Sequence, residues 1–142
     1  MITTKDIVAA ANAAMKEAFP DIPVRSTDFQ KNVVAGCLCT EYPCPTFDGP
    51  DCFRHESGTI RIHYFPKNED YREEFADMQI KLSEVFFGVL RINEDFAIPI
   101  NELTFEESDG VLIASFDYET YQLVEETGED MTELKLGFSE SE

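Results

Sequence analysis

The residues that could do chemistry in this 142-residue chain are four cysteines, two histidines and many carboxylates. The cysteines follow the spacing C-x-C-x4-C-x7-C, at Cys37, Cys39, Cys44 and Cys52. Structural zinc sites usually draw thiolates from pairs separated by about two to four residues, and the first pair here is closer than that. The pattern therefore favours four reduced thiols, two in a strand and two in a loop, over a zinc site.

A disulfide is a second possibility, and Cys44 with Cys52 is the pair to consider. Disulfides are rare in proteins that stay in a cytoplasm, so the prediction remains reduced thiols. Nucleophilic catalysis would need a histidine beside a cysteine, and nothing in the sequence arranges His55 or His63 in that way. We interpret both histidines as surface residues.

Five carboxylates gather on one predicted hairpin: Glu106, Glu107, Asp109, Asp117 and Glu119. A glycosidase would hold a carboxylate pair at a fixed separation, in a pocket lined by aromatic groups, but the sequence has no tryptophan to stack on a sugar. It also lacks a glycine-rich phosphate loop and the motifs G-x-S-x-G and H-E-x-x-H. The cluster indicates an acidic outward face, and we predict no catalytic residue, no cofactor and no metal site.

The charge balance restricts the class of partner. Asp and Glu number 29 against 11 Lys and Arg, for a formal net charge of −18. Nucleic-acid backbones and anionic membranes both attract Lys and Arg, so we expect neither sequence-specific nucleic-acid binding nor membrane binding. The charge favours a basic or polar protein partner. The first ten residues lack the basic region and apolar run of a signal peptide, so we expect folding in a cytoplasm.

The first 20 residues predict a helix. Thr3 or Thr4 can cap its start, and Pro20 follows its end. Its apolar positions form one stripe at helical spacing: Ile7, Ala11, Met15 and Ala18.

A second helix is predicted over 68–87, with Asn68 as its cap and Gly88 just past its end. Its apolar positions also follow the helical period: Tyr71, Phe75, Met78, Leu82 and Val85.

Extended segments account for most of the remaining pattern. Apolar residues alternate within 54–65, where Gly58 is a candidate for a bulge. Small apolar residues over 33–40 are typical of a central strand, and 22–25 reads as a short extended segment. The proline-rich stretch 41–53 is predicted to be a long loop.

Two hairpins are predicted near the end of the domain. The first joins 90–92 to 96–100. In the second, Asp109-Gly110 favours a type I′ turn, in a register that sets Phe105 opposite Ala114 and Leu103 opposite Phe116. Leu112, Ala114, Phe116 and Tyr118 would then share one face. Two helices and about six strands favour a single-domain α+β fold, with both helices on one face of a mixed, mostly antiparallel sheet.

The stretch 49–70 carries a family resemblance. It reads G-P-D-x-x-R-x4-T-I-x-I-x-Y-F-P-K-N-E-D and resembles the middle of the small tail terminator (tail completion) proteins of tailed phages and prophages. The segments E-A-F-P-D-I-P-V at 17–24 and S-D-G-V-L-I-A-S-F-D-Y-E-T-Y at 108–121 are similar too. Two features depart from the family pattern: the cysteines within 33–40, and the proline- and cysteine-rich loop that follows.

The resemblance implies a structural virion protein and no enzyme. Its implied role is a ring, usually a homohexamer, that caps the distal end of the tail tube, ends tube growth and forms the junction to the head connector. Its partners would be further copies of itself, the tail tube protein, the sheath protein of a contractile tail, and the head connector protein. It would be assembled in the host cytoplasm and reside in a virion or a phage-tail-like particle. Two alternatives stay open: another neck protein, such as a head-completion or connector subunit, and a small acidic regulatory protein that binds a basic partner.

Two groups of apolar side chains are candidates for subunit or tail contacts. Tyr42, Phe47 and Phe53 lie in the predicted long loop, and exposed aromatics favour interfaces. Leu134, Leu136 and Phe138 alternate with polar residues near the C-terminus, as in a strand that could add to a neighbouring sheet edge. The alternative is that this last segment docks on its own domain.

The acidic residues suggest a lumen or an outward surface, and Glu106, Asp117 and Glu119 are the candidates. Like charge along a channel would keep DNA from adhering. We expect a domain over 1–121, followed by an acidic C-terminal extension or arm over 122–142.

Overall fold

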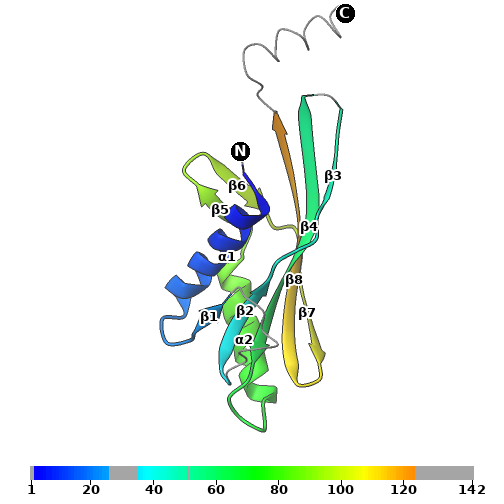
Figure 1. The fold of residues 1–142 in the computed structure, drawn as a ribbon. Coiled ribbons are helices and arrows are strands. Elements are labelled where there is room, and N and C mark those ends of the chain that lie inside the picture. Colours follow the sequence, from blue (N-terminus) through cyan, green and yellow to red (C-terminus); the bar gives the residue numbers. More distant parts are fainter. Residues whose placement is uncertain (1, 26–34, 51, 124–142) are drawn as a thin grey trace, which may run out of the picture.

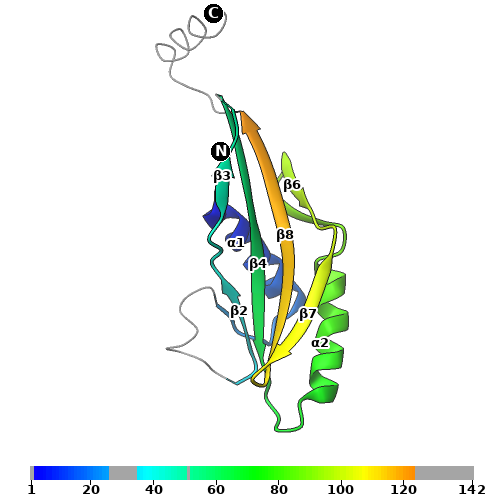
Figure 2. The ribbon, with the colours of Figure 1, turned by 90° about the vertical axis from the view of Figure 1, so that its right-hand side faces the viewer.

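The computed structural model describes residues 2–25, 35–50 and 52–123. A six-stranded sheet forms one layer, and two helices with a separate two-stranded hairpin form the other (Figure 1). Figure 2 looks onto the outer face of the sheet, which no helix covers in the described part of the chain. The chain therefore has the α+β fold that the sequence predicts, with both helices on one face.

The elements are α1 (Thr4–Ala18), β1 (Val24–Arg25), β2 (Cys37–Glu41), β3 (Thr46–Asp48), β4 (Phe53–Phe65), α2 (Arg72–Val85), β5 (Val89–Asn93), β6 (Phe96–Pro99), β7 (Leu103–Ser108) and β8 (Val111–Leu123). The large sheet has the order β1-β2-β4-β8-β7, and β3 pairs with the first part of β4. The β1–β2 pair is parallel, and the other pairs are antiparallel. β5 and β6 form a hairpin of their own, as predicted.

Thr3, one of the two caps that the sequence predicts, starts α1, and it does so through a capping box. The Thr3 hydroxyl accepts a hydrogen bond from the Asp6 backbone N–H, and the Asp6 carboxylate accepts one from the Thr3 N–H. Ile7, Ala11 and Met15 are buried, as predicted. Ala18 is exposed and Phe19 is buried in its stead, because the helix ends there.

Glu74, and not the predicted Asn68, orders the start of α2. The helix begins after Tyr71, and no side chain caps it. Asn68 donates to Glu74 from its backbone N–H and its side chain, and Lys67 N–H and the Tyr64 hydroxyl donate to the same carboxylate. A first-turn carboxylate at the positive end of the helix can gather these donors, and so it fixes the connection from β4.

The predicted apolar face of α2 is confirmed: Phe75, Met78 and Leu82 are buried, while Tyr71 and Val85 are partly buried. The Asp109-Gly110 turn is also confirmed, since both residues have positive φ, 52° and 74°. Its register pairs Leu103 with Phe116 and Phe105 with Ala114, as predicted.

Two strand predictions need correction. The strand expected over 33–40 begins only at Cys37, because Gly36 turns the chain with a φ of 77°; residues 33 and 34 lie outside the described residues. The predicted loop over 41–53 contains β3, which pairs with β4 in the register Asp48–His55. Three residues among prolines are too short a pattern for sequence periodicity to detect.

Gly58 makes room for a side chain and does not mark a bulge. The β4–β8 register is unbroken from Phe53 to Tyr64. A Cβ at Gly58 would lie 3.0 Å from the Tyr118 hydroxyl. Without that Cβ, the Tyr118 ring can cross β4 and reach Glu56.

The core fills the space between the helices and the inner face of the sheet. The sheet contributes Leu38, Ile60, Ile62, Tyr64, Leu112, Ala114, Phe116 and Tyr118. The last four lie on one face of β8, as the sequence predicts.

No helix among the described residues is long and apolar enough to cross a membrane.

β4 and β8 are much longer than their neighbours, with 13 residues each. Their upper ends, together with β3, extend beyond the helices (Figure 1). We call this three-stranded region, formed by β3, 53–57 of β4 and 119–123 of β8, the sheet tip.

Candidate interaction surface

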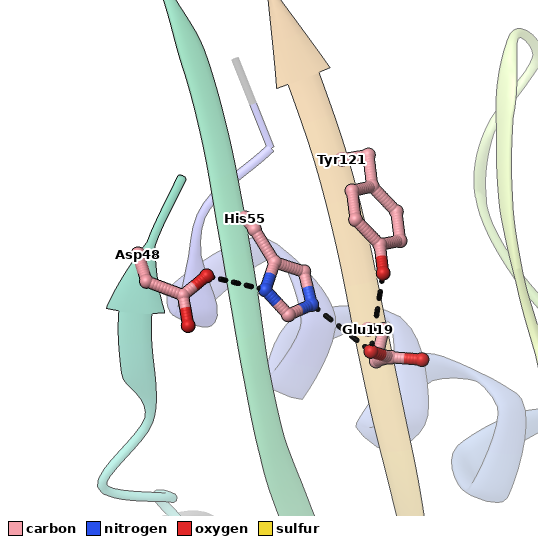
Figure 3. A network of polar contacts seen from close by, with 4 residues as sticks. All are labelled: Asp48, His55, Glu119 and Tyr121. Atoms are coloured by element: carbon pink, nitrogen blue, oxygen red, sulfur yellow. Dashed lines mark hydrogen bonds and ion pairs between the residues drawn. The ribbon is translucent and has the colours of Figure 1, made fainter. Parts of the chain in front are cut away.

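A histidine between two carboxylates occupies the outer face of the sheet tip (Figure 3). His55 on β4 places Nδ1 2.6 Å from Asp48 Oδ1 on β3 and Nε2 2.9 Å from Glu119 Oε1 on β8. Tyr121 stacks on the imidazole, with ring centroids 4.4 Å apart, and donates its hydroxyl to Glu119 at 3.3 Å. The register explains the cluster, since His55 pairs with Asp48 on one side and Tyr121 on the other.

The two carboxylates favour a charged imidazole. Hydrogen bonds to Asp48 and Glu119 raise the pKa of His55 above its ordinary value of 6.5, and desolvation opposes them. The His55 side chain is 19% exposed, whereas those of Asp48 and Glu119 are 62% and 58% exposed. The cluster thus lies at the surface, where solvent screens its charges.

Large apolar side chains are exposed around this cluster. Phe53, Tyr121 and Leu123 share the outer face of the tip and are 43%, 57% and 70% exposed. Phe47 is 49% exposed on the inner face, where the Arg54 guanidinium lies 4.5 Å from its ring centroid. Tyr42, in the connection before β3, is half-exposed as well. Gathered apolar side chains of this kind mark interaction sites.

A cleft of about 710 Å³ adjoins the tip where β2 ends and β3 begins. Its walls include the carboxylates of Glu41, Asp117 and Glu119 and the guanidinium of Arg61. Asp117 accepts a hydrogen bond of 2.7 Å from the Thr59 hydroxyl. Carboxylates outnumber the guanidinium among these groups, so the outer face is acidic here and suits a basic partner better than a phosphate.

A buried carboxylate holds the inner face of the tip to α1. Glu56 is fully buried, and its Oε2 accepts hydrogen bonds of 2.8 Å from the hydroxyls of Thr4 and Tyr118. Thr4 is the first residue of α1, and a helix N-terminus stabilises an anion. Gln122 adds two hydrogen bonds to the backbone of Ile2, of 2.6 and 2.9 Å.

Neither Glu56 nor Gln122 was among the residues predicted to matter from the sequence. The signal was the alternation along β4: Glu56 falls on the same face as Ile60 and Ile62, so it had to point inward.

The predicted surface position of the histidines is wrong for His63, which is 8% exposed. His63 lies directly opposite Cys39 in the β2–β4 ladder, and its Nε2 lies 2.9 Å from Glu41 Oε1. The structure therefore does place a cysteine beside a histidine. Cys39 is fully buried, so a substrate has no access to its thiol.

The remaining cysteines are free thiols. Cys37 is buried, Cys44 is exposed and Cys52 is partly exposed, with no disulfide among the four. Within the described ranges, no three His, Cys, Asp or Glu side chains come together to hold a metal ion.

The predicted acidic residues do not all lie together. Asp117 and Glu119 line the cleft, whereas Glu106 is exposed on β7, opposite Ile113. Leu134, Leu136 and Phe138 lie outside the described residues. β8 continues through the predicted domain boundary at Tyr121 to Leu123; the separate C-terminal arm stays a prediction.

The chain is an α+β domain whose sheet tip exposes the aromatic side chains of Phe47, Phe53 and Tyr121. A family model described as phage tail terminator protein matches residues 6–130. The chain therefore belongs to the phage tail terminator family, as the sequence resemblance indicates. That family is one of structural tail proteins, so the chain is a structural component of a phage tail and of the virion.

A solved structure shares the fold with a TM-score of 0.50 and 14% sequence identity, over 89% of this chain and 99% of that one. At this identity the likeness concerns the fold alone. A search of curated proteins found no match.

Proposed function

We propose that the chain assembles into a homohexameric ring that caps the distal end of the tail tube, ends tube growth and forms the junction to the head connector. The proposal rests on the family match over 6–130. The exposed apolar tip supports it, because Phe53, Tyr121 and Leu123 would lose contact with water in an assembled particle.

Ring closure and capping both follow from surface complementarity. A head-to-tail contact between two different patches of the same chain closes into a ring when its rotation allows. One face of the ring would reproduce the contacts of the tube subunit and the other would not, so the tube stops growing. We assign subunit or tail contacts to Tyr42, Phe47 and Phe53, all of which are exposed.

The acidic outer face has a role in this proposal. Glu106, Asp117 and Glu119 would line the lumen or its rim, where like charge keeps the passing DNA from adhering. Repulsion between subunits opposes assembly, and salt screens it.

The C-terminal segment would act as an arm. Leu134, Leu136 and Phe138 would add to the sheet edge of a neighbouring subunit or a tail protein. The further partners are the tail tube protein, the head connector and, in a contractile tail, the sheath protein. The particle is a virion or a phage-tail-like particle assembled in the host cytoplasm.

Negative-stain imaging of the purified chain, with and without tube subunits, tests this proposal. We expect sixfold rings that bind tube ends and shorten the tubes formed. Rings that bind the connector but not the tube would indicate another neck protein. A monomer that binds only a basic protein would indicate a regulatory protein.

A matched pair of variants tests the role of the tip. Phe53→Ser removes an exposed apolar group from the tip, and Ile80→Ser removes one from the exposed side of α2. We expect only Phe53→Ser to impair ring formation or tube capping. Light scattering measures ring formation, and negative-stain imaging shows whether tubes are capped. Equal behaviour of the two variants would remove the tip from the assembly contacts.

A further inference from the structure

The His55 cluster has a geometry that a neutral imidazole cannot satisfy. A neutral ring has one N–H, whereas the imidazolium has two. Here each ring nitrogen faces a carboxylate oxygen, Asp48 Oδ1 at 2.6 Å and Glu119 Oε1 at 2.9 Å. Carboxylates only accept hydrogen bonds when ionised, so both contacts form together only when His55 is protonated.

The contact to Asp48 matters because β3 is weakly attached. β3 has three residues, and all are exposed. Its attachments in the described structure include the short ladder with β4, the stacking of Arg54 on Phe47, and the Asp48–His55 contact. Losing one of these few contacts affects β3 much more than the long β4–β8 ladder.

We propose that His55 is a pH-sensitive clasp that, when protonated, ties β3 to β8 across β4 and fixes the outer face of the sheet tip. When His55 loses its proton, one of the two carboxylates loses its donor and β3 opens from the tip. Thr46 of β3 and Glu119 both line the cleft, so opening β3 also changes the cleft.

The two carboxylates that face His55 act in the same direction, since both raise its pKa. Asp48 faces it from β3, and Glu119 and Tyr121 face it from β8. The negative charge of Glu119 raises the pKa of Tyr121, so that phenol stays neutral. The charged neighbours on β4, Arg54 and Glu56, point to the inner face of the sheet.

The direction of the pH dependence follows from the raised pKa of His55. The clasp contributes fully below the ordinary value of 6.5, where His55 is protonated even in the unfolded chain. Its contribution is lost as pH rises through the higher pKa of the folded chain. The clasp is a property of the single chain and holds whether or not the chain forms a ring.

Nuclear magnetic resonance of the full chain tests the proposal, with imidazole nitrogen shifts and amide exchange followed against pH. We expect protection factors of the β3 amides, corrected for the intrinsic pH dependence of exchange, to fall several-fold as His55 deprotonates. Amides in the middle of β4 and β8 should keep theirs. Unchanged β3 protection across the His55 titration would overturn the clasp.

Matched variants separate the clasp from a general charge effect. Glu119→Gln and Asp48→Asn each remove a carboxylate partner of His55. Asp117→Asn removes the same charge from the same face of the sheet, but Asp117 bonds Thr59 and not His55. We expect the first two to lower the His55 titration midpoint by much more than Asp117→Asn does. Equal shifts in all three variants, or no shift in any, would contradict the proposal.

Discussion

At the scale of single residues, Glu56 stands out because its carboxyl group is fully buried and needs hydrogen-bond donors from its neighbours. A buried charge is tolerated only when it is hydrogen-bonded or paired. Thr4 and Tyr118 supply two donors to Glu56, and Gly58 leaves the space that Tyr118 needs. These four residues come from α1, β4 and β8 and make the tip and the helix layer one unit.

Removing the Tyr118 hydroxyl should therefore destabilise the chain. Tyr118→Phe takes one donor from the buried carboxyl group of Glu56, and we expect a loss of about 1–3 kcal/mol in the free energy of unfolding. Urea denaturation measures it. Tyr121→Phe is the matched control, since that hydroxyl is exposed and bonds Glu119 at the surface. Equal destabilisation by the two variants would show that the hydrogen bond to Glu56 contributes no more to stability than a surface hydrogen bond does.

The sequence revealed little of this residue-scale chemistry. His55 acquires Asp48 as a partner only because β3 lies beside β4, and β3 falls in a stretch that was predicted to be a loop. His63 was predicted at the surface, yet β2 places Cys39 and Glu41 around it. Contacts between strands distant in the sequence cannot be read from local periodicity.

At the scale of elements, prediction succeeded where the signal is local. The threonine cap of α1, the apolar stripe of α2 and the Asp109-Gly110 turn are each encoded in a short stretch of sequence, and all are confirmed. The strand order β1-β2-β4-β8-β7 is not local and was not predicted. The prediction that Asn68 caps α2 was wrong, because Asn68 donates its hydrogen bonds to Glu74, which lies inside the first turn of the helix.

The packing of α2 on the sheet should depend strongly on Phe75. It is 3% exposed, and its ring meets those of Tyr64 and Tyr71 at centroid distances of 6.2 and 4.7 Å. We expect Phe75→Ala to cost about 3–5 kcal/mol of stability through the cavity it leaves. Thermal denaturation measures it, with Ile80→Ala on the exposed side of the same helix as control. An unchanged midpoint for Phe75→Ala would contradict the assigned core.

At the scale of the whole molecule, the fold separates a compact helix-covered body from an extended tip (Figure 1). The tip ends where β8 ends, at Leu123, and the last 19 residues of the chain follow from there. At about 3.3–3.6 Å per residue, the 11 residues from Leu123 to Leu134 can span at most about 40 Å. That reach is greater than a small domain's radius, so an arm could contact a neighbouring subunit.

A truncation ending at Gly128 decides between an arm and a docked last element. If Leu134, Leu136 and Phe138 add to a neighbour, the truncated chain keeps the free energy of unfolding of the full chain but loses ring formation or capping. If the segment docks on its own domain, truncation exposes the apolar surface it covered, and the free energy of unfolding falls.

Substitutions in the full chain make the same test without shortening it. Replacing the three apolar residues with serine should reproduce the assembly defect of the truncation, because only that set would supply the buried contacts. Glu133→Gln with Lys135→Gln is the control, since in an extended arm these residues alternate with the apolar set and face the other way. Loss of assembly with both sets would mean that the segment does not act through an apolar strand face alone. Loss of the fold with the serine set would make the segment part of the core.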